Sequence, residues 1–596
     1  MKILSFDTET RGLDWWDPGQ RAFLIAYADA DGEYIARVDD DKAVSEFVDR
    51  CCEADVLVAH NLPFDVHQLR ETIGWSPTSL LAAGTKLYDT EIMARVLFPM
   101  GQAGSPSTYR LKTLAQTYLR EDAADDQEAI AEMARAIGLK TIRQQGAYYE
   151  VWRAYPDVLE RYAQTDVRLT YDLFVFMWKE LERRPELERV MELERKVAPI
   201  LIAAEARGVA LDTRRVRELL EEETAKAERL RNQLEAEGIQ PEGEGSEQSL
   251  IDGLLAHGVP LYRRTRTGAL ATNRYALQEF EADYEIVRLL RDYRESAKLV
   301  STYYGPMSDV EVVHTSFQAI GAWSGRMSSR RPNMQNVPKA ARSVIVPRDG
   351  YAFVVADYDA IEMRLLAYYT GSREYRDLVA NSDPHAWMAS KIHGGSPEDF
   401  AKGGPNDARR SAAKNSLFAI CYGAGAPRIT DMNGLPRGSR YKAGDNAVRQ
   451  GWKRVGDYKY EPARRLIADI KSAIPGFRRL QARIDSKVRS AGHVNTLFGR
   501  RQPVGRDKSY VGLNALIQGS AADIMKQGLL NAVSALSDYD AHVLLVVHDE
   551  LVVEARIEDA ERVRELVVQA MKDAYPLDPP LEVTSTVVYN HYGEAK

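Results

Sequence analysis

The chain has 596 residues, of which 79 are Lys or Arg and 87 are Asp or Glu, giving a formal net charge of −8. This length accommodates roughly three or four domains, and a hydrophobic fraction of 45% is ordinary for a soluble globular protein. Total charge does not indicate a nucleic-acid partner, so local charge must decide that question. Because neither a signal sequence nor an apolar run of about 18 residues occurs, we expect a cytoplasmic protein without membrane contact.

Short apolar strands alternate with helical segments up to about residue 188, which predicts an α/β domain. Long amphipathic helices with dense i,i+4 charge pairs continue to about residue 240. Strand patterns return at about 311 to 380, and a mainly helical block follows to about 500. The remaining residues combine helices with a terminal hairpin. The three cysteines (Cys51, Cys52 and Cys421) fit neither a zinc site nor a disulfide framework, so a reducing interior is expected.

Two apolar strands in the C-terminal half end in acidic residues. YAFVVADYDA places Asp357 at the end of a strand that turns into a helix. HVLLVVHDELVVEA places His548, Asp549 and Glu550 between two strands. Charged side chains are almost never buried unless they are paired or bind a metal, so packing does not explain this placement. Because Asp357 and Asp549 flank the helical block, we expect that block to be an insertion into one α+β domain.

A stripe of cations and aromatics lies within the helical block. In RRSAAKNSLFAICYG every fourth residue belongs to it: Arg410, Lys414, Phe418 and Tyr422. Each step of four residues drifts by only about 40°, so the side chains share one face of a helix. The cations can contact a triphosphate, and the aromatics can contact a sugar and a base. An ordinary amphipathic helix with an aromatic core side would also give this pattern.

The N-terminal domain carries three polar pairs, which are Asp7 with Glu9, Asn61 with Asp65, and Tyr162 with Asp166. The first pair is two apart in a predicted strand and shares one face. The other pairs are four apart, so each can share a helical face. Carboxylate oxygens suit magnesium or manganese, and paired ions can promote phosphodiester hydrolysis. Each carboxylate alone is more simply a solvated loop residue, so only the combination is informative.

These motifs resemble those of two known families. The order DxE, NxxxD, YxxxD is similar to that of proofreading 3′–5′ exonucleases of the DEDD type with tyrosine. RxxxKxxxFxxxYG, DYDAIEMR and VHDE resemble the nucleotide-binding helix and the two carboxylate motifs of family A DNA polymerases, the group of bacterial DNA polymerase I. SGRMSSRRPNMQNVP, SDPHAWMA, GHVNTLFGRR and NALIQGSAADIMK are also similar, so the resemblance covers essentially the whole chain.

The resemblance implies a multidomain α/β and α+β fold, with an RNase H-like exonuclease domain followed by a right-hand polymerase. The implied divisions are the exonuclease domain at 1–188, the thumb at 189–310, the first part of the palm at 311–380, the fingers at 381–505 and the second part of the palm at 506–596. No segment corresponds to the 5′ nuclease domain of the full bacterial enzyme. A bacteriophage replicative polymerase, acting in the host cytoplasm, is therefore the expected source.

For the polymerase site, the resemblance implies two-metal phosphoryl transfer from a deoxynucleoside triphosphate to a primer 3′ end. Asp357, Asp549 and the carbonyl group of Tyr358 would bind two Mg²⁺ ions, which Mn²⁺ can replace. Glu550 would support them. The implied nucleotide contacts are Lys414, Arg410 and His385 on the phosphates, Phe418 and Tyr422 on the sugar and base, and Glu362 as a steric gate against ribose. Lys414 could also protonate the leaving group.

For the exonuclease site, the resemblance implies that Asp7, Glu9, Asp65 and Asp166 hold two metal ions. Tyr162 would orient the attacking water, and because no ligand is missing we expect active proofreading.

Polar residues of the polymerase motifs are expected to contact DNA without reading its sequence, since minor-groove acceptors occupy similar places in every base pair. They are Arg326, Asn333, Gln335, Asn514, Gln518 and His548. A basic stretch either contacts phosphates or is a solvated loop, and the two interpretations stand equally. It comprises Arg437, Arg440, Lys442, Arg449, Lys453, Arg454 and Lys459.

Three features depart from the family pattern. Ala360 stands where glutamine is usual, Tyr510 stands where arginine is usual, and the segment 433–460 is longer than expected. The first two put a DNA contact in doubt, not metal binding. The alternative functions are a single-subunit RNA polymerase and a non-catalytic, polymerase-derived DNA-binding protein. Glu362 and the complete carboxylate sets argue against them. Expected partners are primer-template DNA and deoxynucleoside triphosphates. A helicase, a primase and a single-strand binding protein are further candidate partners. We expect the protein to be a monomer.

Overall fold

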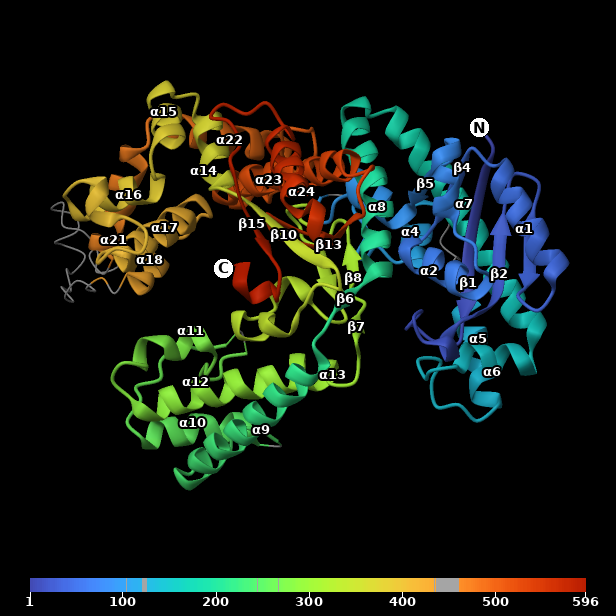
Figure 1. Ribbon diagram of the computed structural model, residues 1–596, viewed down its shortest axis with the longest axis horizontal. Helices are drawn as coiled ribbons and strands as arrows, with labels where there is room; N and C mark the ends of the chain where they lie inside the picture. The colour runs from blue at the N-terminus through green and yellow to red at the C-terminus, as the bar shows by residue number, and fades with distance from the viewer. Residues whose placement is uncertain are drawn as a thin grey trace, which may run out of the picture.

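The computed structural model describes residues 1–102, 104–119, 126–243, 245–265, 267–433, 435 and 460–595. Figure 1 shows an N-terminal part (blue) lying beside a larger part that is built around a central sheet. None of the described helices is long and apolar enough to cross a membrane.

The N-terminal part contains a five-stranded sheet in the order β3-β2-β1-β4-β5. Its strands are β1 (Ile3–Thr10), β2 (Ala22–Ala28), β3 (Glu33–Arg37), β4 (Val56–Ala59) and β5 (Lys86–Asp89). β2 is antiparallel to both of its neighbours, whereas β4 is parallel to β1 and β5. Parallel neighbours need helical crossovers, so this mixed sheet confirms the α/β class expected for the segment.

Helices cover this sheet: α1 (Asp41–Glu53), α2 (Leu62–Ile73), α3 (Thr90–Leu97), α4 (Leu111–Tyr118), α5 (Asp126–Ala136), α6 (Ala147–Ala154) and α7 (Pro156–Glu182). α7 packs along β1 and β2, and Ser5 Oγ of β1 donates to the Val167 carbonyl oxygen of α7 at 2.9 Å. Asp89 fixes two helix starts, because its carboxylate accepts from the backbone N–H groups of Leu62 and Glu91. These contacts align the starts of α2 and α3 with the sheet edge.

The central sheet is antiparallel in the order β13-β14-β10-β15. Its strands are β10 (Tyr351–Tyr358), β13 (Ala541–Val547), β14 (Glu550–Arg556) and β15 (Val583–Val588). β10 precedes the helical block and the other three strands follow it. The block is therefore an insertion into one sheet-based unit, as the flanking positions of Asp357 and Asp549 predicted.

The block and the segments after it are mainly helical. They contain α14 (Ile361–Thr370), α15 (Arg373–Asn381), α16 (Pro384–His393), α17 (Asp407–Cys421), α18 (Ala426–Met432), α21 (Glu461–Ala473), α22 (Phe477–Ala491), the ribbon β11 (His493–Asn495) with β12 (Arg501–Pro503), α23 (Gly512–Ala535) and α24 (Ala560–Lys572). In Figure 1 the helices α15 to α18 and α21 lie beyond one end of the sheet, while α23 and α24 lie against it.

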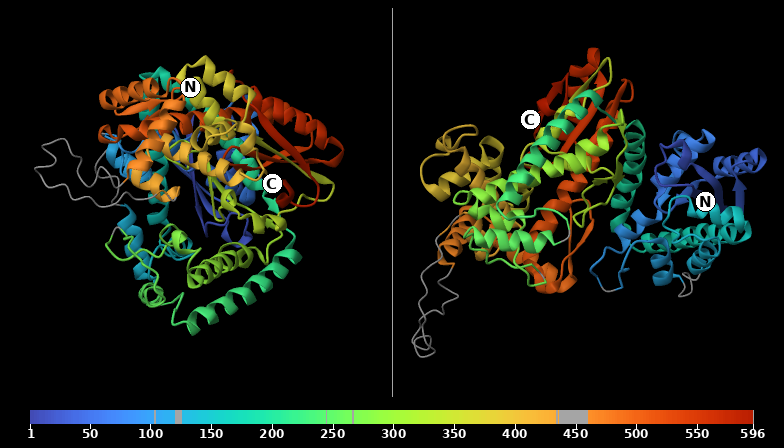
Figure 2. Two further views of the ribbon diagram at one scale, coloured as in Figure 1. Left: turned by 90° about the vertical axis from the view of Figure 1, so that its left-hand side faces the viewer. Right: turned by 90° about the horizontal axis from the view of Figure 1, so that it is seen from below.

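A third group of elements lies between the N-terminal part and β10. It contains α8 (Glu188–Arg207), β6 (Val209–Ala210), α9 (Thr213–Ala236), α10 (Ser246–Ala256), α11 (Arg274–Leu277), α12 (Glu285–Lys298), α13 (Gly305–Met307), β7 (Val312–Val313), β8 (Ser316–Gln318) and β9 (Ser328–Arg330). Figure 2 shows α9 and its neighbours (green) projecting away from the sheet. They enclose a small core of their own, which includes Leu234, Leu254 and Leu290.

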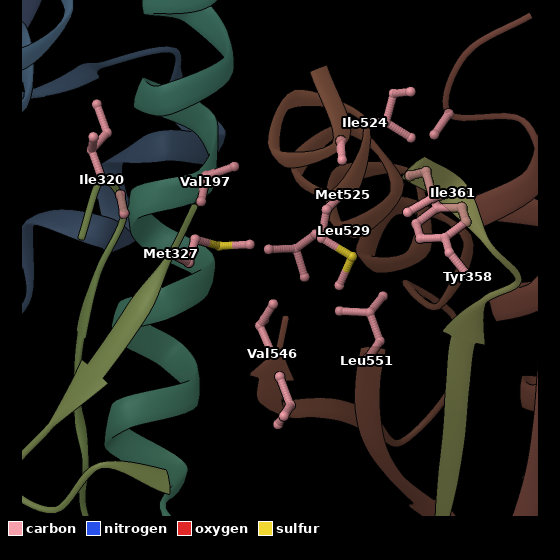
Figure 3. Packing of buried hydrophobic residues seen from close by; sticks show 14 of the residues in the cluster. Val197, Ile320, Met327, Tyr358, Ile361, Ile524, Met525, Leu529, Val546 and Leu551 are labelled. Carbon is pink, nitrogen blue, oxygen red and sulfur yellow. The ribbon is translucent and has the colours of Figure 1, made fainter. Parts of the chain in front are cut away.

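The largest core lies where α8 meets α23 and the central sheet. In Figure 3 Val197 of α8 and Met327 face Met525 and Leu529 of α23, with Val546 and Leu551 beneath them. Met327 directly follows Arg326, and Leu551 directly follows Glu550. Apolar packing thus fixes the backbone next to the polar residues singled out in the sequence.

Candidate active sites

The first candidate site lies at one end of the central sheet. β10 pairs with β14 so that Asp357 stands opposite Glu550, and the Tyr358 N–H donates to the Asp549 carbonyl oxygen at 3.1 Å. Sheet pairing thus brings Asp357 and Asp549 together from distant parts of the sequence. We expected no packing role for the acidic residues between β13 and β14, and for Glu550 this expectation is wrong. It is buried, and its carboxylate accepts a hydrogen bond from the Tyr592 hydroxyl.

A polar network joins this sheet end to two helices. Arg326 Nη2 donates to Glu362 Oε1 at 2.9 Å and to Asp549 Oδ1 at 3.3 Å. The Tyr422 hydroxyl donates to the other carboxylate oxygen of Glu362. Burial raises the pKa of Glu362, while the bonds from Tyr422 and Arg326 oppose that rise. Residues from a turn, α14, the end of α17 and the hairpin are therefore held in one site.

The stripe predicted on the basic helix is present on α17. Its two rings stack, with the centroids of Phe418 and Tyr422 at 6.0 Å and an interplanar angle of 18°. Lys414 Nζ lies 5.8 Å from the Phe418 centroid. Tyr422 stands one residue beyond the helix, as its C-cap. The stripe thus presents cations and aromatics on one continuous side.

The cationic end of the stripe meets the start of α16. Arg410 Nε donates to Asp383 Oδ2 at 2.7 Å, and Asp383 also caps α16. Burial alone would raise the pKa of Asp383, but Arg410 and the backbone donors hold it below its usual value. The His385 ring lies 5.7 Å from that of Phe418, and burial lowers its pKa to about 4. His385 is therefore neutral at pH 7.

The predicted DNA-contact residues have varied surroundings. Gln335 is buried, and its Nε2 donates to the carbonyl oxygens of Met327 and Val546 at 3.3 and 2.7 Å, so its donor is engaged within the protein. Asn333 Oδ1 accepts from the Gln335 N–H at 3.1 Å. Gln518 is hydrogen-bonded to Tyr422 beside Glu362.

Two further predicted contacts lie on α23 and at the turn between β13 and β14. Asn514 lies on α23, and its buried Oδ1 has no hydrogen-bond partner among the described residues. His548 is exposed at the hairpin turn. The basic stretch from Arg437 to Lys459 lies outside the described residues.

Left-handed backbone conformations outside glycine occur at four described positions, which are Asn61, Arg331, Ala360 and His548, with φ values of 68°, 57°, 50° and 57°. Such residues are strained and cluster at functional sites. Ala360 caps α14 just after Asp357, and His548 directly precedes Asp549. Because alanine carries a Cβ, this conformation is strained and does not explain why alanine stands at position 360.

The second candidate site lies in the N-terminal part. β1 supplies Asp7 and Glu9, α2 supplies Asp65, and α7 supplies Tyr162 and Asp166. The N–H and hydroxyl groups of Thr8 donate to Asp65 Oδ1 at 2.9 and 2.7 Å, which ties α2 to β1. Asn61 does not share a helical face with Asp65 as predicted, because it is the left-handed residue before α2.

Electrostatics confirm that these carboxylates lie close together. Burial raises the pKa of Asp7 well above its usual range, and Asp65, Glu9 and Asp166 each add to the rise. Burial and the neighbouring carboxylates raise the pKa of Glu9 to about 8. Burial raises the pKa of Asp65 to about 7. A bound cation would relieve both causes, so the donor set suits a hard divalent ion.

The acidic side chains of the two sites are not already arranged as metal ligands. Among the described residues, no three His, Cys, Asp or Glu side chains are arranged as a preformed metal site. In the second site the ammonium of Lys112, on α4, donates to Asp166 Oδ1. In the first site Arg326 occupies Asp549 in the same way. Both sites therefore offer carboxylate oxygens that suit divalent ions, and in each site a cation of the protein bonds to one of these oxygens.

Several functional residues escaped the sequence analysis. Lys112, Asp89 and Tyr592 contact or support predicted site residues. Apart from the local bond between Asp89 and Glu91, these partners lie 27 or more positions away along the chain, as with Asp89 and Leu62. No local spacing therefore indicated them, although Asp89 does follow a short apolar strand, as Asp357 does.

Comparison with known proteins agrees with this geometry. The family model described as DNA polymerase family A matches residues 214–593, and the model described as 3′–5′ exonuclease matches residues 1–182. DNA polymerase I, thermostable, of Thermus filiformis is 32% identical over 66% of this chain and 47% of its own length. DNA polymerase I of Pseudomonas aeruginosa is 28% identical over 99% of this chain and 63% of its own length. The chain thus spans about half to just under two thirds of these relatives.

A solved structure has the same fold. The POL domain of Pol1 from M. smegmatis, in complex with DNA primer-template and dNTP, matches with a TM-score of 0.77 at 24% identity, over 99% of this chain and 95% of that chain. The fold is therefore an exonuclease domain joined to a polymerase domain, as the motifs predicted. Because the polymerase family model matches most of its length, the chain belongs to DNA polymerase family A.

Proposed function

We propose that this chain is a template-directed DNA polymerase that adds deoxynucleotides to a primer 3′ end and proofreads with a 3′–5′ exonuclease. The observation that carries the proposal is the convergence of Asp357 and Asp549 beside the Glu362–Tyr422–Arg326 network and the stripe of α17. Family membership and the second carboxylate cluster support it. The division into exonuclease domain, thumb, palm and fingers at the boundaries given above is part of the proposal.

In the polymerase site, Asp357, Asp549 and the Tyr358 carbonyl group would hold two divalent ions, with Mg²⁺ the expected metal and Mn²⁺ a substitute. Such ions make the primer 3′-hydroxyl a better nucleophile and neutralise charge on the triphosphate. Glu550 is too deeply buried to be a ready ligand, and its bond to Tyr592 suits it to positioning the hairpin.

The nucleotide would bind along α17. Lys414 and Arg410 supply positive charge for the phosphates, and neutral His385 can donate one hydrogen bond there. Lys414 is exposed and can deliver a proton to the leaving group. Phe418 offers its ring to the sugar. The buried Glu362 would exclude or leave unpaired a ribose 2′-hydroxyl, which disfavours ribonucleotides.

In the exonuclease site, Asp7, Glu9, Asp65 and Asp166 would hold divalent ions, and Tyr162 would orient the attacking water. Burial raises the pKa of Tyr162, so its hydroxyl stays protonated and can donate or accept a hydrogen bond. The proposed partners are primer-template DNA and deoxynucleoside triphosphates, with replisome proteins in addition. We also propose action in the cytoplasm, as expected for a chromosomal or phage replication enzyme.

Primer extension with deoxynucleotides and with ribonucleotides, in Mg²⁺, tests the polymerase assignment against the RNA polymerase alternative. We expect extension with deoxynucleotides only, and loss of it in Asp357→Asn. Extension with ribonucleotides at a comparable rate would favour the alternative. Equal extension by Asp357→Asn and wild type would refute the site.

Degradation of a single-stranded 3′ end tests the exonuclease assignment. Asp7→Ala should abolish degradation and leave synthesis largely intact. If the variant degrades the strand as fast as the wild type does, this carboxylate cluster is not the exonuclease site.

A further inference from the structure

Lys112 lies inside the carboxylate cluster of the N-terminal part. It belongs to the first turn of α4, and its ammonium donates to Asp166 Oδ1 of α7. Its Nζ also lies 5.0 Å from the centroid of the Tyr162 ring. The side chains of Lys112 and Asp166 are 14% and 11% exposed, so water screens this ion pair only weakly. The pair is therefore an internal part of the site and not a surface salt bridge.

The ammonium acts on more than one carboxylate. It lowers the pKa of Asp7 and of Glu9, against the larger effects of burial and of neighbouring carboxylates that raise them. A salt bridge that only held α4 to α7 would need Asp166 alone. Lys112 instead faces several predicted metal ligands at once, and its position is that of a counter-ion for the cluster.

A divalent ion that used Asp166 Oδ1 would need the oxygen that Lys112 already holds. The ammonium group and the metal ion cannot both bind this oxygen strongly, because two positive charges in a weakly screened site repel each other. We propose that Lys112 is a resident counter-ion that competes with the divalent ion for Asp166 and thereby sets the metal concentration at which the exonuclease site is loaded. This inference rests on the proposed exonuclease function.

The test is Mn²⁺ binding to the full-length chain without DNA, followed by electron paramagnetic resonance of the free ion. Asp357→Asn and Asp549→Asn are present throughout, so that the polymerase site contributes equally little to every titration. Lys112→Met keeps the length of the side chain but removes its charge. We expect it to bind Mn²⁺ at the exonuclease site on the order of tenfold more tightly, since a charged hydrogen bond to Asp166 no longer competes.

Two matched variants control for charge and position. Lys112→Arg keeps the charge and should bind Mn²⁺ about as the parent does. Lys179→Met removes an exposed lysine from α7, the helix that carries Asp166, and should change nothing. Unchanged or weaker Mn²⁺ binding by Lys112→Met would overturn the proposal, as would tighter binding by Lys179→Met to the same extent.

Asp166→Asn provides a second line of evidence and guards against misfolding. In that background the contested oxygen has lost its charge, so Lys112→Met should raise Mn²⁺ affinity less than it does in the parent, through Asp7 and Glu9 alone. An equal gain in both backgrounds would overturn the competition mechanism. Thermal unfolding of each variant shows whether it is folded, and Lys112→Gln replaces Lys112→Met if that variant is not.

The failure of this inference is distinguishable from failure of the proposed function. If Asp7→Ala and its parent bind equally little Mn²⁺ and the wild type degrades no DNA, the exonuclease assignment itself fails. If the wild type degrades DNA and Asp7→Ala removes a Mn²⁺ site, but Lys112→Met matches the parent, only the role of Lys112 fails.

Discussion

Phe418 lies on α17, where the proposed function places the sugar of the incoming nucleotide. Its ring stacks on Tyr422 and lies against His385, so its position is fixed. In Phe418→Tyr the added hydroxyl can make a hydrogen bond that otherwise depends on the 3′-hydroxyl of the incoming sugar. We expect dideoxynucleotide incorporation to rise on the order of tenfold relative to deoxynucleotides, because one hydrogen bond contributes roughly 1 kcal/mol.

Competition between dideoxy- and deoxynucleotides in primer extension measures this ratio. Tyr422→Phe removes a hydroxyl from the neighbouring ring and is a useful contrast, since it should leave dideoxynucleotide discrimination largely unchanged. An unaltered ratio in Phe418→Tyr would contradict the placement of the sugar at this ring.

At the residue scale, the sequence predicted those side chains whose spacing repeats locally. The four-residue period of α17 and the two-residue period of Asp7 and Glu9 are set by backbone geometry, so both appear in the structure. Lys112, Glu550 and Arg326 contact residues that lie far away along the chain. Their buried contacts depend on tertiary packing, which no local spacing encodes.

At the element scale, the end of α17 depends on Gly423. Its φ of +80° lies in the left-handed region, and a Cβ there would meet Tyr510 Cδ2 at 2.4 Å and the Tyr510 carbonyl oxygen at 3.0 Å. Gly423→Ala should therefore displace the neighbouring Tyr422. We expect a loss of stability of about 1–3 kcal/mol and an increase in the deoxynucleotide KM on the order of tenfold.

Gly394→Ala is the matched control, because Gly394 also has a positive φ of +77° but its Cβ would meet no atom of the described residues within 4 Å. It should cost some stability and leave the KM unchanged. Equal KM values for Gly423→Ala and wild type would show that the contact between Gly423 and Tyr510 does not position Tyr422 for the proposed nucleotide site.

The carboxylates on β1 should make the stability of the fold depend on pH. Burial and neighbouring carboxylates raise the pKa of Glu9 to about 8, whereas its usual value is 4.5. Between these values the folded state holds more protons than the unfolded state, so without divalent ions stability should fall as the pH rises from about 4.5 to 8. Mg²⁺ should reverse this loss, because it binds the ionised cluster of the folded state.

Thermal unfolding of the full chain in EDTA and in Mg²⁺, from pH 5 to 8, measures the effect. Glu9→Gln removes one of the titrating groups and should flatten the dependence in EDTA. A melting temperature in EDTA that is level or rises over this range would contradict the crowding of carboxylates on β1.

At the scale of the whole molecule, α8 connects the two sites. Its Glu205 bonds His67 of α2 at 2.7 Å, and its Arg207 donates to the buried Glu554 of β14 at 2.7 Å. α2 carries Asp65 and β14 begins at Glu550. One helix thus contacts both α2 of the exonuclease domain and β14 of the central sheet.

A buried ionic cluster anchors α8 to α23. Lys526 and Glu194 are both fully buried and hydrogen-bonded, and Arg500 joins Glu194 to Asp523. Lys526→Met would leave Glu194 with one counter-ion fewer, so we expect a loss of about 3–5 kcal/mol in the free energy of unfolding. Arg465→Ala, which removes an exposed pair with Glu461, should cost under about 1 kcal/mol.

Denaturant titrations of both variants and the wild type provide the comparison. A cost for Lys526→Met no larger than that for Arg465→Ala would mean that the buried cluster adds nothing to the attachment of α8.

The sequence predicted the order of the large parts better than their contacts. The α/β pattern before residue 188 and the insertion between β10 and β13 could be inferred, because hydrophobic periods and strand ends are local features. The attachment of α8 to both domains could not be inferred. In the sequence, Glu194, Glu205 and Glu554 look like the exposed glutamates of any charged helix or strand. Their burial depends on partners more than 100 positions away.

The most direct measurement follows a labelled primer with a mismatched 3′ end, annealed to template, in Mg²⁺ and deoxynucleotides. The account predicts that the wild type removes the mismatch and then extends the primer. Asp357→Asn should shorten the primer without extending it. Asp7→Ala should leave the mismatch in place but still extend a primer whose 3′ end is matched. If either substitution abolishes both reactions in a folded protein, or neither abolishes any, the assignment of two separate catalytic centres is contradicted.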